Sequence, residues 1–203
     1  LRARCLHLLG ARIGARTRIY EIMLINPFVG FSNLTVGEDT VIGTGTTIDL
    51  TGHVEIGSHT AIAPGCMFMT HSDPGSRIGN RLCALYPRTI SPVRIGDHVW
   101  IGEQVWIDNL ATTRLRSHSC ISQGALLLCG NHNYKKTTFD LIVNEITLEE
   151  GAWAGARSVV CGGVTMGSHS LLTVGSVATS SLDPYWIYQG NPAVKVKERV
   201  VRV

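Results

Sequence analysis

The sequence has few charged residues: they make up 16% of the 203 residues, against 44% hydrophobic residues. This balance is typical of a chain with an apolar core and excludes a disordered protein. The formal net charge is only +3, and no run of lysine and arginine occurs. Without such a run, neither nucleic acid nor an anionic membrane surface is an expected partner.

Long apolar segments are also missing. No stretch approaches the roughly 20 apolar residues that span a bilayer, so we expect no membrane insertion. The basic start LRARCLHLLG has too short an apolar segment for a secretory signal. These observations favour a cytoplasmic location.

Motifs for metals, disulfides and phosphates are absent from the sequence as well. The six cysteines show no CxxC spacing, and no histidine is followed by another five residues later. We interpret the cysteines as small buried side chains and expect no metal. Neither GxGxxG nor a P-loop occurs, and the glycines follow a different period.

That period is six residues, and it covers most of the chain. An aliphatic or aromatic residue recurs with a small or acidic residue after it in most units, as in IGTGTT, IGSHTA and IGEQVW. The recurring positions are Val36, Ile42, Ile48, Ile56, Ile62, Phe68, Ile95, Ile101, Ile107, Leu115, Ile121, Leu127, Leu148, Ala154, Val160, Met166, Leu172 and Ala178.

A six-residue period fits neither a helix nor a hairpin sheet. It predicts an all-β parallel solenoid of about six triangular coils, with three short strands in each turn of about 18 residues. The aliphatic residue points inward, and the following Gly or Asp is expected to supply positive φ at the corner. Such repeats resemble the left-handed β-helix, which is where the predicted handedness comes from. Ala154, at an inward position, is expected to leave a small void.

Three segments are expected. Residues 1–33 form an N-terminal helix, from Arg2 to Leu9, and the first strand units. Residues 34–182 form the β-helix, and residues 183–203 form a C-terminal tail or strand against the last coil.

The β-helix also contains a longer repeat. Residues 34–70 align without a gap on residues 93–129, and both copies contain one eight-residue step where six is the rule. Each copy ends near a histidine, His71 or His132, and an irregular excursion follows, at 72–92 and at 133–145. We interpret the two histidines as counterparts in a duplicated front half.

A histidine at the base of such an excursion is held by the solenoid and open to solvent, as a general base must be. The alternative is a corner histidine without a catalytic role, which fits His59, His98, His118 and His169 well. Cys129 is three residues from His132, but no orienting carboxylate is evident, so a packing role is favoured over a nucleophile.

The array resembles the hexapeptide-repeat acyltransferases. Residues 93–197, with the motifs GNHNY and YQGNPA, look like the bacterial exopolysaccharide (colanic-acid-type) O-acetyltransferases. The front half, with THSDPGS before YPRTISPVRIG, looks more like the maltose and galactoside O-acetyltransferases.

This resemblance implies a homotrimer that binds acetyl-CoA in clefts between neighbouring solenoids and acetylates a saccharide hydroxyl. The catalytic histidine corresponds to His132, with His71 as second choice, because a CoA near the C-terminal coils would fall short of His71 by about 10–15 Å. The implied acceptor-positioning residue is Asn109, with Asp49 as its counterpart in the front copy, and Tyr134 could stack on a sugar ring or anchor its loop.

The resemblance also implies a cofactor-binding surface. The implied residues are Trp153, Gly155 and Ala156 at the thioester, and Gly175, Ala178, Asn191, Pro192, Ala193 and Lys195 along the pantetheine and nucleotide. In the expected reaction His132 deprotonates the hydroxyl and backbone N–H groups near Gly155 and Ala156 stabilise the oxyanion. The alternatives are N-acetylation of an amino sugar or other small acceptor, and a non-catalytic solenoid that binds glycan or protein.

Overall fold

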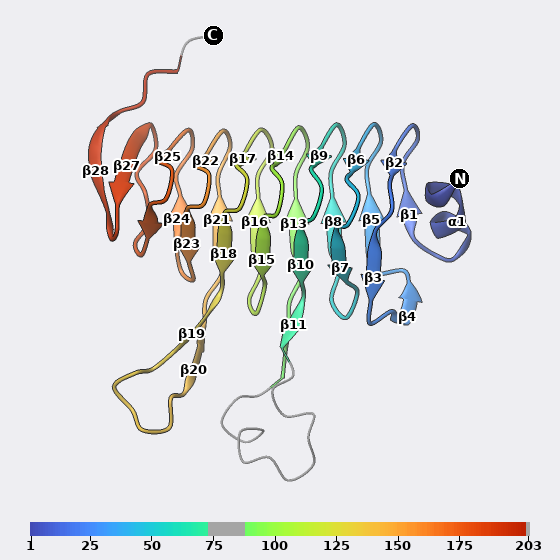
Figure 1. Cartoon of the computed structure of the whole chain (residues 1–203), viewed down its shortest axis with the longest axis horizontal. Helices are drawn as coiled ribbons and strands as arrows, with labels where there is room; N and C mark the ends of the chain where they lie inside the picture. The colour runs from blue at the N-terminus through green and yellow to red at the C-terminus, as the bar shows by residue number, and fades with distance from the viewer. Residues whose placement is uncertain (73–87, 202–203) are drawn as a thin grey trace.

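The chain winds into a parallel β-helix around one apolar core (Figure 1). The computed structural model describes residues 1–72 and 88–201. In Figure 1 the coils stack along one axis, with the N-terminal helix at one end and strands β27 and β28 at the other. Strands β11, β19 and β20 project from the same side of the stack. The all-β parallel β-helix predicted from the period is confirmed, and its parallel sheets agree with the left-handed β-helix that the resemblance implied.

Each coil adds one short strand to each of three sheets, called A, B and C in chain order. Sheet A contains β1 (Arg12–Ile13), β5 (Leu34–Val36), β8 (Val54–Ile56), β13 (Val93–Ile95), β16 (Thr113–Leu115), β21 (Ile146–Leu148) and β24 (Thr165–Met166). Sheet B contains β2 (Arg18–Ile19), β6 (Val41–Ile42), β9 (Ala61–Ile62), β14 (Trp100–Ile101), β17 (Cys120–Ile121), β22 (Trp153–Ala154), β25 (Leu171–Leu172), β27 (Trp186–Gly190) and β28 (Ala193–Glu198). Sheet C contains β3 (Met23–Ile25), β7 (Thr47–Asp49), β10 (Met67–Met69), β15 (Trp106–Asp108), β18 (Leu126–Leu128), β23 (Val159–Cys161) and β26 (Val177–Ala178).

The sheets meet at three edges, named AB, BC and CA after the sheets that they join. Two hairpin stems leave the CA edge. In the first, β11 (His71–Ser72) pairs antiparallel with β12 (Thr89–Ile90). In the second, β19 (Gly130–His132) pairs with β20 (Leu141–Val143). These stems carry the two predicted excursions, of which residues 73–87 lie outside the described residues. A further short strand, β4 (Phe28–Phe31), follows the first coil.

The predicted inward positions form the core. All eighteen aliphatic or aromatic positions of the period are buried, none more than 4% exposed. They stack in register from coil to coil, as Phe68, Ile107 and Leu127 do in sheet C. Ala154 is buried between Ile121 and Leu172 in sheet B.

The array is one coil longer than the sequence indicated. Sheets A and C each have seven strands, whereas about six coils were expected. The additional coil is at the N-terminus, where Arg12, Arg18 and Met23 start strands that pair in parallel with the next coil.

The glycine after the inward residue has a different role from the one predicted. Positive φ occurs two residues later, as at His59 (φ 55°) and His98 (φ 55°). The glycine is needed because neighbouring coils touch there: a Cβ on Gly37 would lie 2.5 Å from the backbone nitrogen of Ser58. The constraint is close backbone approach between coils rather than left-handed backbone.

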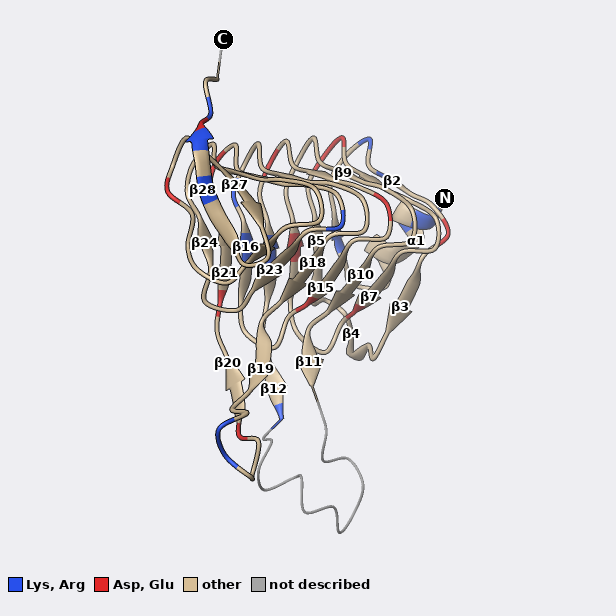
Figure 2. Cartoon of the chain, turned by 60° about the vertical axis from the view of Figure 1, so that its left-hand side comes forward, with Lys and Arg blue, Asp and Glu red and all other residues tan. Residues whose placement is uncertain are grey.

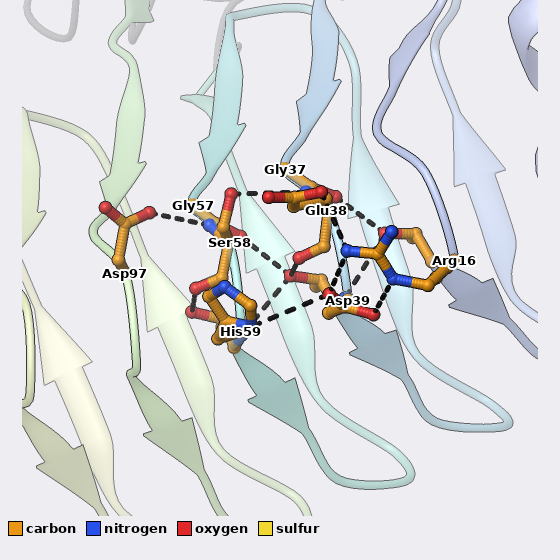
Figure 3. A network of polar contacts seen from close by, with 11 residues as sticks. Arg16, Gly37, Glu38, Asp39, Gly57, Ser58, His59 and Asp97 are labelled. Carbon is orange, nitrogen blue, oxygen red and sulfur yellow. Dashed lines mark hydrogen bonds and ion pairs between the residues drawn. The ribbon is translucent and has the colours of Figure 1, made fainter.

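Polar contacts run between coils along the AB edge (Figure 3). The Arg16 guanidinium contacts Asp39 and Glu38, and the Asp97 carboxylate accepts from the Ser58 N–H at 2.6 Å. The rings of His59, His98 and His118 continue the row, stacked with centroids 4.9 Å apart. These histidines are corner residues, as the sequence suggested.

Both ends of the core are covered. Helix α1 (Arg2–Leu8) ends one residue earlier than predicted, and Ala3 and Leu6 pack against the first coil. At the other end β27 pairs in parallel with β25, and β28 folds back antiparallel on β27. These covers protect the open ends of the stacked core from water.

Candidate active site

The two predicted histidines lie on the hairpin stems of the CA edge, but they are not counterparts. β11 begins directly after Thr70 and β19 directly after Cys129, so the position of His71 corresponds to Gly130. His132 is two residues further out along its stem, a distance of about 7 Å. The interpretation of His71 and His132 as equivalent residues is therefore wrong, because the 59-residue offset of the repeat does not relate them.

His132 is anchored by its own hairpin. Its Nδ1 lies 2.8 Å from the carbonyl oxygen of Phe139. A carbonyl only accepts hydrogen bonds, so Nδ1 carries the proton and Nε2 carries the lone pair. Lys136 and Thr138 each contact the Asp140 carboxylate at 2.6 Å, which fixes the end of the hairpin. The imidazole thus has the tautomer that a general base requires.

His71 is anchored to the body of the β-helix instead. Its Nδ1 lies 2.5 Å from Oδ2 of Asp49, a side chain with no exposed surface. Because the carboxylate accepts from Nδ1–H, the lone pair of this ring is also on Nε2. The His71 side chain itself is 17% exposed.

A cluster of donors holds Asp49 in its ionised form. The Asn26 amide donates at 3.0 Å, the Thr51 hydroxyl at 2.9 Å and the Thr70 hydroxyl at 2.8 Å, and the backbone N–H groups of both threonines add two more bonds. Burial alone would raise the pKa of Asp49, but the bonds from His71, Thr70 and Asn26 outweigh it and lower the pKa. Asp49 is therefore a carboxylate below neutral pH as well as above it.

Asp49 has a different counterpart from the one predicted. Ile48 and Ile107 both pair with Phe68, so Asp49 corresponds to Asp108 and not to Asn109. Among the described residues Asp108 has no comparable set of donors, and burial raises its pKa. The predicted correspondence of Asn109 with Asp49 is wrong. Both copies contain the same eight-residue step, so the offset between the copies stays at 59 residues and relates Asp49 to Asp108.

Asn109 is built into the CA edge between the two hairpins. Its side chain has no exposed surface, and its amide donates to the Ser91 carbonyl at 2.8 Å. Its Oδ1 has no hydrogen-bond partner within the described part of the chain. The neighbouring Leu110 accepts from the Ser91 hydroxyl and packs against Gly130. Asn109 thus links the roots of the two stems, while Tyr134, at 78% exposure, stands on the second hairpin.

Trp153, Gly155 and Ala156 come together in a shallow hollow of about 350 Å³ on the BC edge. The Trp153 indole N–H donates to the Ser122 hydroxyl at 2.8 Å, and the ring remains 39% exposed. Thr173 and Val174 of the next coil complete this hollow.

Only one of the two predicted oxyanion donors is available. The Gly155 N–H donates to the Leu172 carbonyl at 2.8 Å as part of the coil-to-coil ladder. Among the described residues, the Ala156 N–H has no acceptor, since its corner position turns away from the ladder. Of the N–H groups near Gly155 and Ala156, that of Gly155 is therefore not free to stabilise an oxyanion.

The remaining predicted cofactor residues lie around the last coil. Gly175 donates to the Ala156 carbonyl and so adjoins the hollow. Ala178 faces the core at 1% exposure, so its side chain does not reach a surface ligand. Asn191 and Pro192 form the turn between β27 and β28, and Ala193 begins β28. Lys195 pairs with Asp183 at 2.6 Å. Figure 2 shows Lys and Arg along β28 and near the tip of the second hairpin.

The predicted site is therefore divided between two edges of one chain. The histidines are on the CA edge and the Trp153 hollow on the BC edge, with sheet C between them. His132 follows coil five and Trp153 lies in coil six, so the hollow matches the level of His132 along the axis rather than that of His71.

Neither a cysteine nucleophile nor a metal site is apparent among the described residues. Cys129 is 1% exposed, its sulfur contacts the Thr113 hydroxyl, and burial raises the pKa of its thiol. No group of three or more His, Cys, Asp or Glu in residues 1–72 and 88–201 could hold a metal ion. None of the helical segments described has the length and apolar content to span a bilayer.

Sequence reasoning missed the residues around Asp49. Asn26 is 23 residues away from Asp49, and Thr70 is 21 away. Their approach follows from the register of three successive coils, which a single sequence does not show. The one available signal was Asp49 itself, an acidic residue directly after an inward isoleucine.

No protein-family model matches the chain. Two curated proteins, from Escherichia coli (strain K12) and Shigella flexneri, match with 32% identity over 106 residues. Both are named "Putative colanic acid biosynthesis acetyltransferase WcaF". The match covers 52% of this chain and 58% of the relatives, so the chain spans little more than half of their length. Over these 106 residues the chain is similar to proteins named as acetyltransferases.

Solved structures support the same fold. A variant of AntD, an N-acyltransferase from Bacillus cereus in complex with dTDP and coenzyme A, superposes with a TM-score of 0.65 at 18% identity. That match covers 81% of this chain and 83% of AntD. AntD with dTDP and 3-hydroxybutyryl-CoA has a TM-score of 0.63 at 16% identity, covering 98% and 89% of the two chains. At this identity the likeness is one of fold.

The hydrogen bonds around Asp49 predict that the folded protein loses stability in acid. Because the folded pKa of Asp49 lies below the ordinary 3.8, its stabilisation is present above about pH 4 and lost as the pH falls further. Asp49→Asn leaves several donors without a good acceptor and should lower the free energy of unfolding at pH 7 by about 1–3 kcal/mol. Urea unfolding at pH 7 and in steps below pH 4 checks this.

The difference between wild type and Asp49→Asn should shrink as the pH drops below 4. The matched variant Asp97→Asn, on the exposed AB edge, should show a smaller effect at pH 7. A difference that stays constant or grows on acidification would contradict the assignment of Asp49 as a stabilised carboxylate.

Proposed function

We propose that the protein transfers an acyl group, acetyl in the simplest case, from coenzyme A to a hydroxyl of a saccharide or exopolysaccharide precursor. The observation that carries the proposal is the His132 imidazole, whose Nδ1–H donates to the Phe139 carbonyl and leaves Nε2 as the base. The relation to WcaF and the fold shared with AntD, which is solved with coenzyme A and an acyl-CoA, support the donor.

In the proposed reaction Nε2 of His132 takes the proton of the acceptor hydroxyl. The hydroxyl oxygen attacks the thioester carbonyl carbon, and the carbon–sulfur bond breaks as the thiolate leaves. The imidazolium returns the proton to the thiolate, so the products are the ester and the free thiol. Positioning, one base and one oxyanion donor are sufficient for such direct transfer. The Ala156 N–H is the proposed oxyanion donor, because no acceptor for it occurs in the part of the chain that the structure describes.

The proposed binding mode joins two copies of the chain. One chain has its histidine and its hollow on different edges, so in a homotrimer the CA edge of one copy faces the BC edge of the next. The thioester would lie against Trp153 and Ala156. The nucleotide end would extend along Gly175 and the β27–β28 turn, where Lys195 and Lys197 supply positive charge. Tyr134 is placed to stack on the acceptor sugar.

An amino sugar is the second candidate acceptor. AntD is an N-acyltransferase solved with dTDP, and further AntD structures hold dTDP-4-amino-4,6-dideoxyglucose. An amine attacks the thioester through the same steps, with His132 removing the proton from the nitrogen after attack. A non-catalytic glycan-binding solenoid is the remaining alternative, and it predicts no thiol release.

Replacement of His132 tests the proposal. His132→Ala should lower acetyl transfer to the preferred glycoside by about 10²–10⁴-fold, the usual contribution of a general base. Free thiol released from acetyl-CoA is measured with a panel of methyl glycosides and amino sugars as acceptors. His169→Gln, a corner histidine on the AB edge, serves as the matched control and should retain wild-type rates.

Equal rates for His132→Ala and wild type would contradict the role of His132. A wild-type protein that releases no thiol with any acceptor would leave the binding-module alternative. Preference for amino sugars over glycosides would decide for N-acylation.

A backbone change tests the oxyanion donor. Ala156→Pro removes the one N–H in question and should keep the fold, because Pro64 already occupies the same corner position two residues after an inward residue of sheet B. Loss of one oxyanion donor typically lowers kcat about 10²–10³-fold. The measurement is kcat for thiol release, with the thermal midpoint as a check of folding.

Thr44→Pro makes the same change at the corresponding corner of the second coil, far from the hollow. It should leave kcat and the thermal midpoint near wild type. If Ala156→Pro and Thr44→Pro retained the same kcat, the Ala156 N–H would have no part in the reaction.

A further inference from the structure

The first 33 residues carry more positive charge than the chain as a whole. They contain five arginines and a single acidic residue, Glu21, which gives them a net charge of +4. The whole chain has a net charge of +3, so residues 34–203 together have −1. The five arginines are Arg2, Arg4, Arg12, Arg16 and Arg18.

The fold gathers this charge at the N-terminal end of the rod. Figure 2 shows basic residues on helix α1 and beside strand β2, both in the first coil or before it. Arg16 is paired with Asp39 and Glu38 of the second coil. Arg2 and Arg4 have no ion-pair partner in residues 1–72 and 88–201. The sequence expectation against an anionic membrane surface considered runs of neighbouring basic residues, and these arginines are separated in sequence.

The same end exposes large apolar side chains. Leu8 of α1 is 84% exposed, and Phe28 of β4 is 74% exposed. The two elements meet, since a Cβ on Gly10, just after α1, would lie 3.9 Å from the backbone nitrogen of Ser32, just after β4. Figure 1 shows both at the N-terminal end of the stack. The exposed residues here, called the N-terminal apolar face, are Leu1, Leu8, Leu9, Phe28 and Val29.

Helix α1 is apolar on its outer side as well as its inner side. Ala3 and Leu6 pack against the core of the β-helix. Leu1, Cys5 and Leu8 follow one another at helical spacing and are all exposed, with arginines between them. An apolar stripe among basic residues is typical of a helix that lies in the headgroup region of a membrane.

A hollow of about 670 Å³ opens between α1 and the first coil. Its lining is mostly apolar and includes Leu8 and Ile13. Arg4, His7 and Arg16 also line it. A lipid matches this lining, because its acyl chain is apolar and its headgroup phosphate is negative.

The opposite end of the rod differs in its charge. Val194 and Val196 are exposed there as well. However, Lys195 is paired with Asp183, and Glu198 ends the same strand. A nucleic acid would contact the N-terminal arginines but would leave the neighbouring leucines and phenylalanine in water. A lipid surface contacts both kinds of side chain, so it fits the N-terminal end better.

We propose that the N-terminal end of the rod docks peripherally on an anionic lipid surface. The N-terminal apolar face enters the headgroup region, and Arg2, Arg4 and Arg12 contact lipid phosphates. Docking at this end leaves the CA and BC edges open, with His132 on the order of 20 Å, or four coil spacings, from the first coil. The inference goes beyond the proposed function and does not depend on it.

Co-sedimentation with lipid vesicles tests the proposal without any substrate. The protein should bind phosphatidylcholine vesicles that contain about 30% phosphatidylglycerol, and it should bind pure phosphatidylcholine vesicles at least about tenfold more weakly. Binding to the anionic vesicles should weaken as the salt concentration rises.

Charge reversal locates the binding surface. Arg4→Glu combined with Arg12→Glu should lower binding to the anionic vesicles at least about tenfold. Arg94→Glu combined with Arg157→Glu changes the net charge by the same amount on exposed sites of later coils, and it should lower binding far less.

Removal of apolar side chains tests the second contribution. Leu8→Ser combined with Phe28→Ser should also lower binding at least about tenfold. Val194→Ser combined with Val196→Ser, at the opposite end, should bind as the wild type does. All four side chains are exposed, and the thermal midpoint checks that each variant is folded. If the double variant unfolds early, Leu8→Ser alone decides.

Failure of the wild type to bind anionic vesicles would overturn the proposal, and so would equal losses in the N-terminal variants and their controls. Binding that duplex DNA displaces and that the two serines leave unchanged would assign the arginines to nucleic acid instead. Sedimentation velocity gives the last comparison. A wild-type assembly whose mass the change at Leu8 and Phe28 halves would assign the apolar face to a second copy of the chain.

Discussion

The close stacking of one coil on the next is the constraint on which the molecule depends. Adjacent coils are held by parallel strand pairs at about 4.8 Å, so any side chain at a contact point between them must be absent or small. Gly37 meets this demand, since a Cβ there would strike the backbone of Ser58. The same stacking aligns the inward residues into one core and makes any extra segment leave at an edge.

The proposed function depends on the edge at which the two hairpins leave the β-helix. Both hairpins interrupt the CA edge, so each places a histidine at a fixed height on a rigid rod. The anchoring differs between the two. His132 depends on its own hairpin, through the Phe139 carbonyl, whereas His71 depends on Asp49 in the coil beneath it. The front half of the chain thus supplies a second histidine with its own support.

The sequence indicated the fold well because the six-residue period places every inward residue directly. Phe68, Ile107 and Leu127 could be assigned to one stack from spacing alone, and the structure confirms it. Side-chain contacts between coils were harder to predict from the sequence. The bonds from Asn26 and Thr70 to Asp49 join residues more than 20 positions apart, and they depend on side-chain direction as well as register. The equivalence of His71 and His132 failed for a similar reason, since resemblance of motif does not fix position along a strand.

Backbone hydrogen bonds also distinguish the N–H groups of the two residues near which the oxyanion donor was predicted. Gly155 and Ala156 are neighbours in sequence, yet the ladder uses the N–H of one and leaves that of the other without an acceptor among the described residues. Only strand pairing distinguishes them.

The proposed function requires that the chain bind an acyl-CoA at the Trp153 hollow, which calorimetric titration with acetyl-CoA measures. We expect saturable binding with one site per chain, weakened by Trp153→Ala. No binding heat above dilution, or binding unaffected by that substitution, would contradict it.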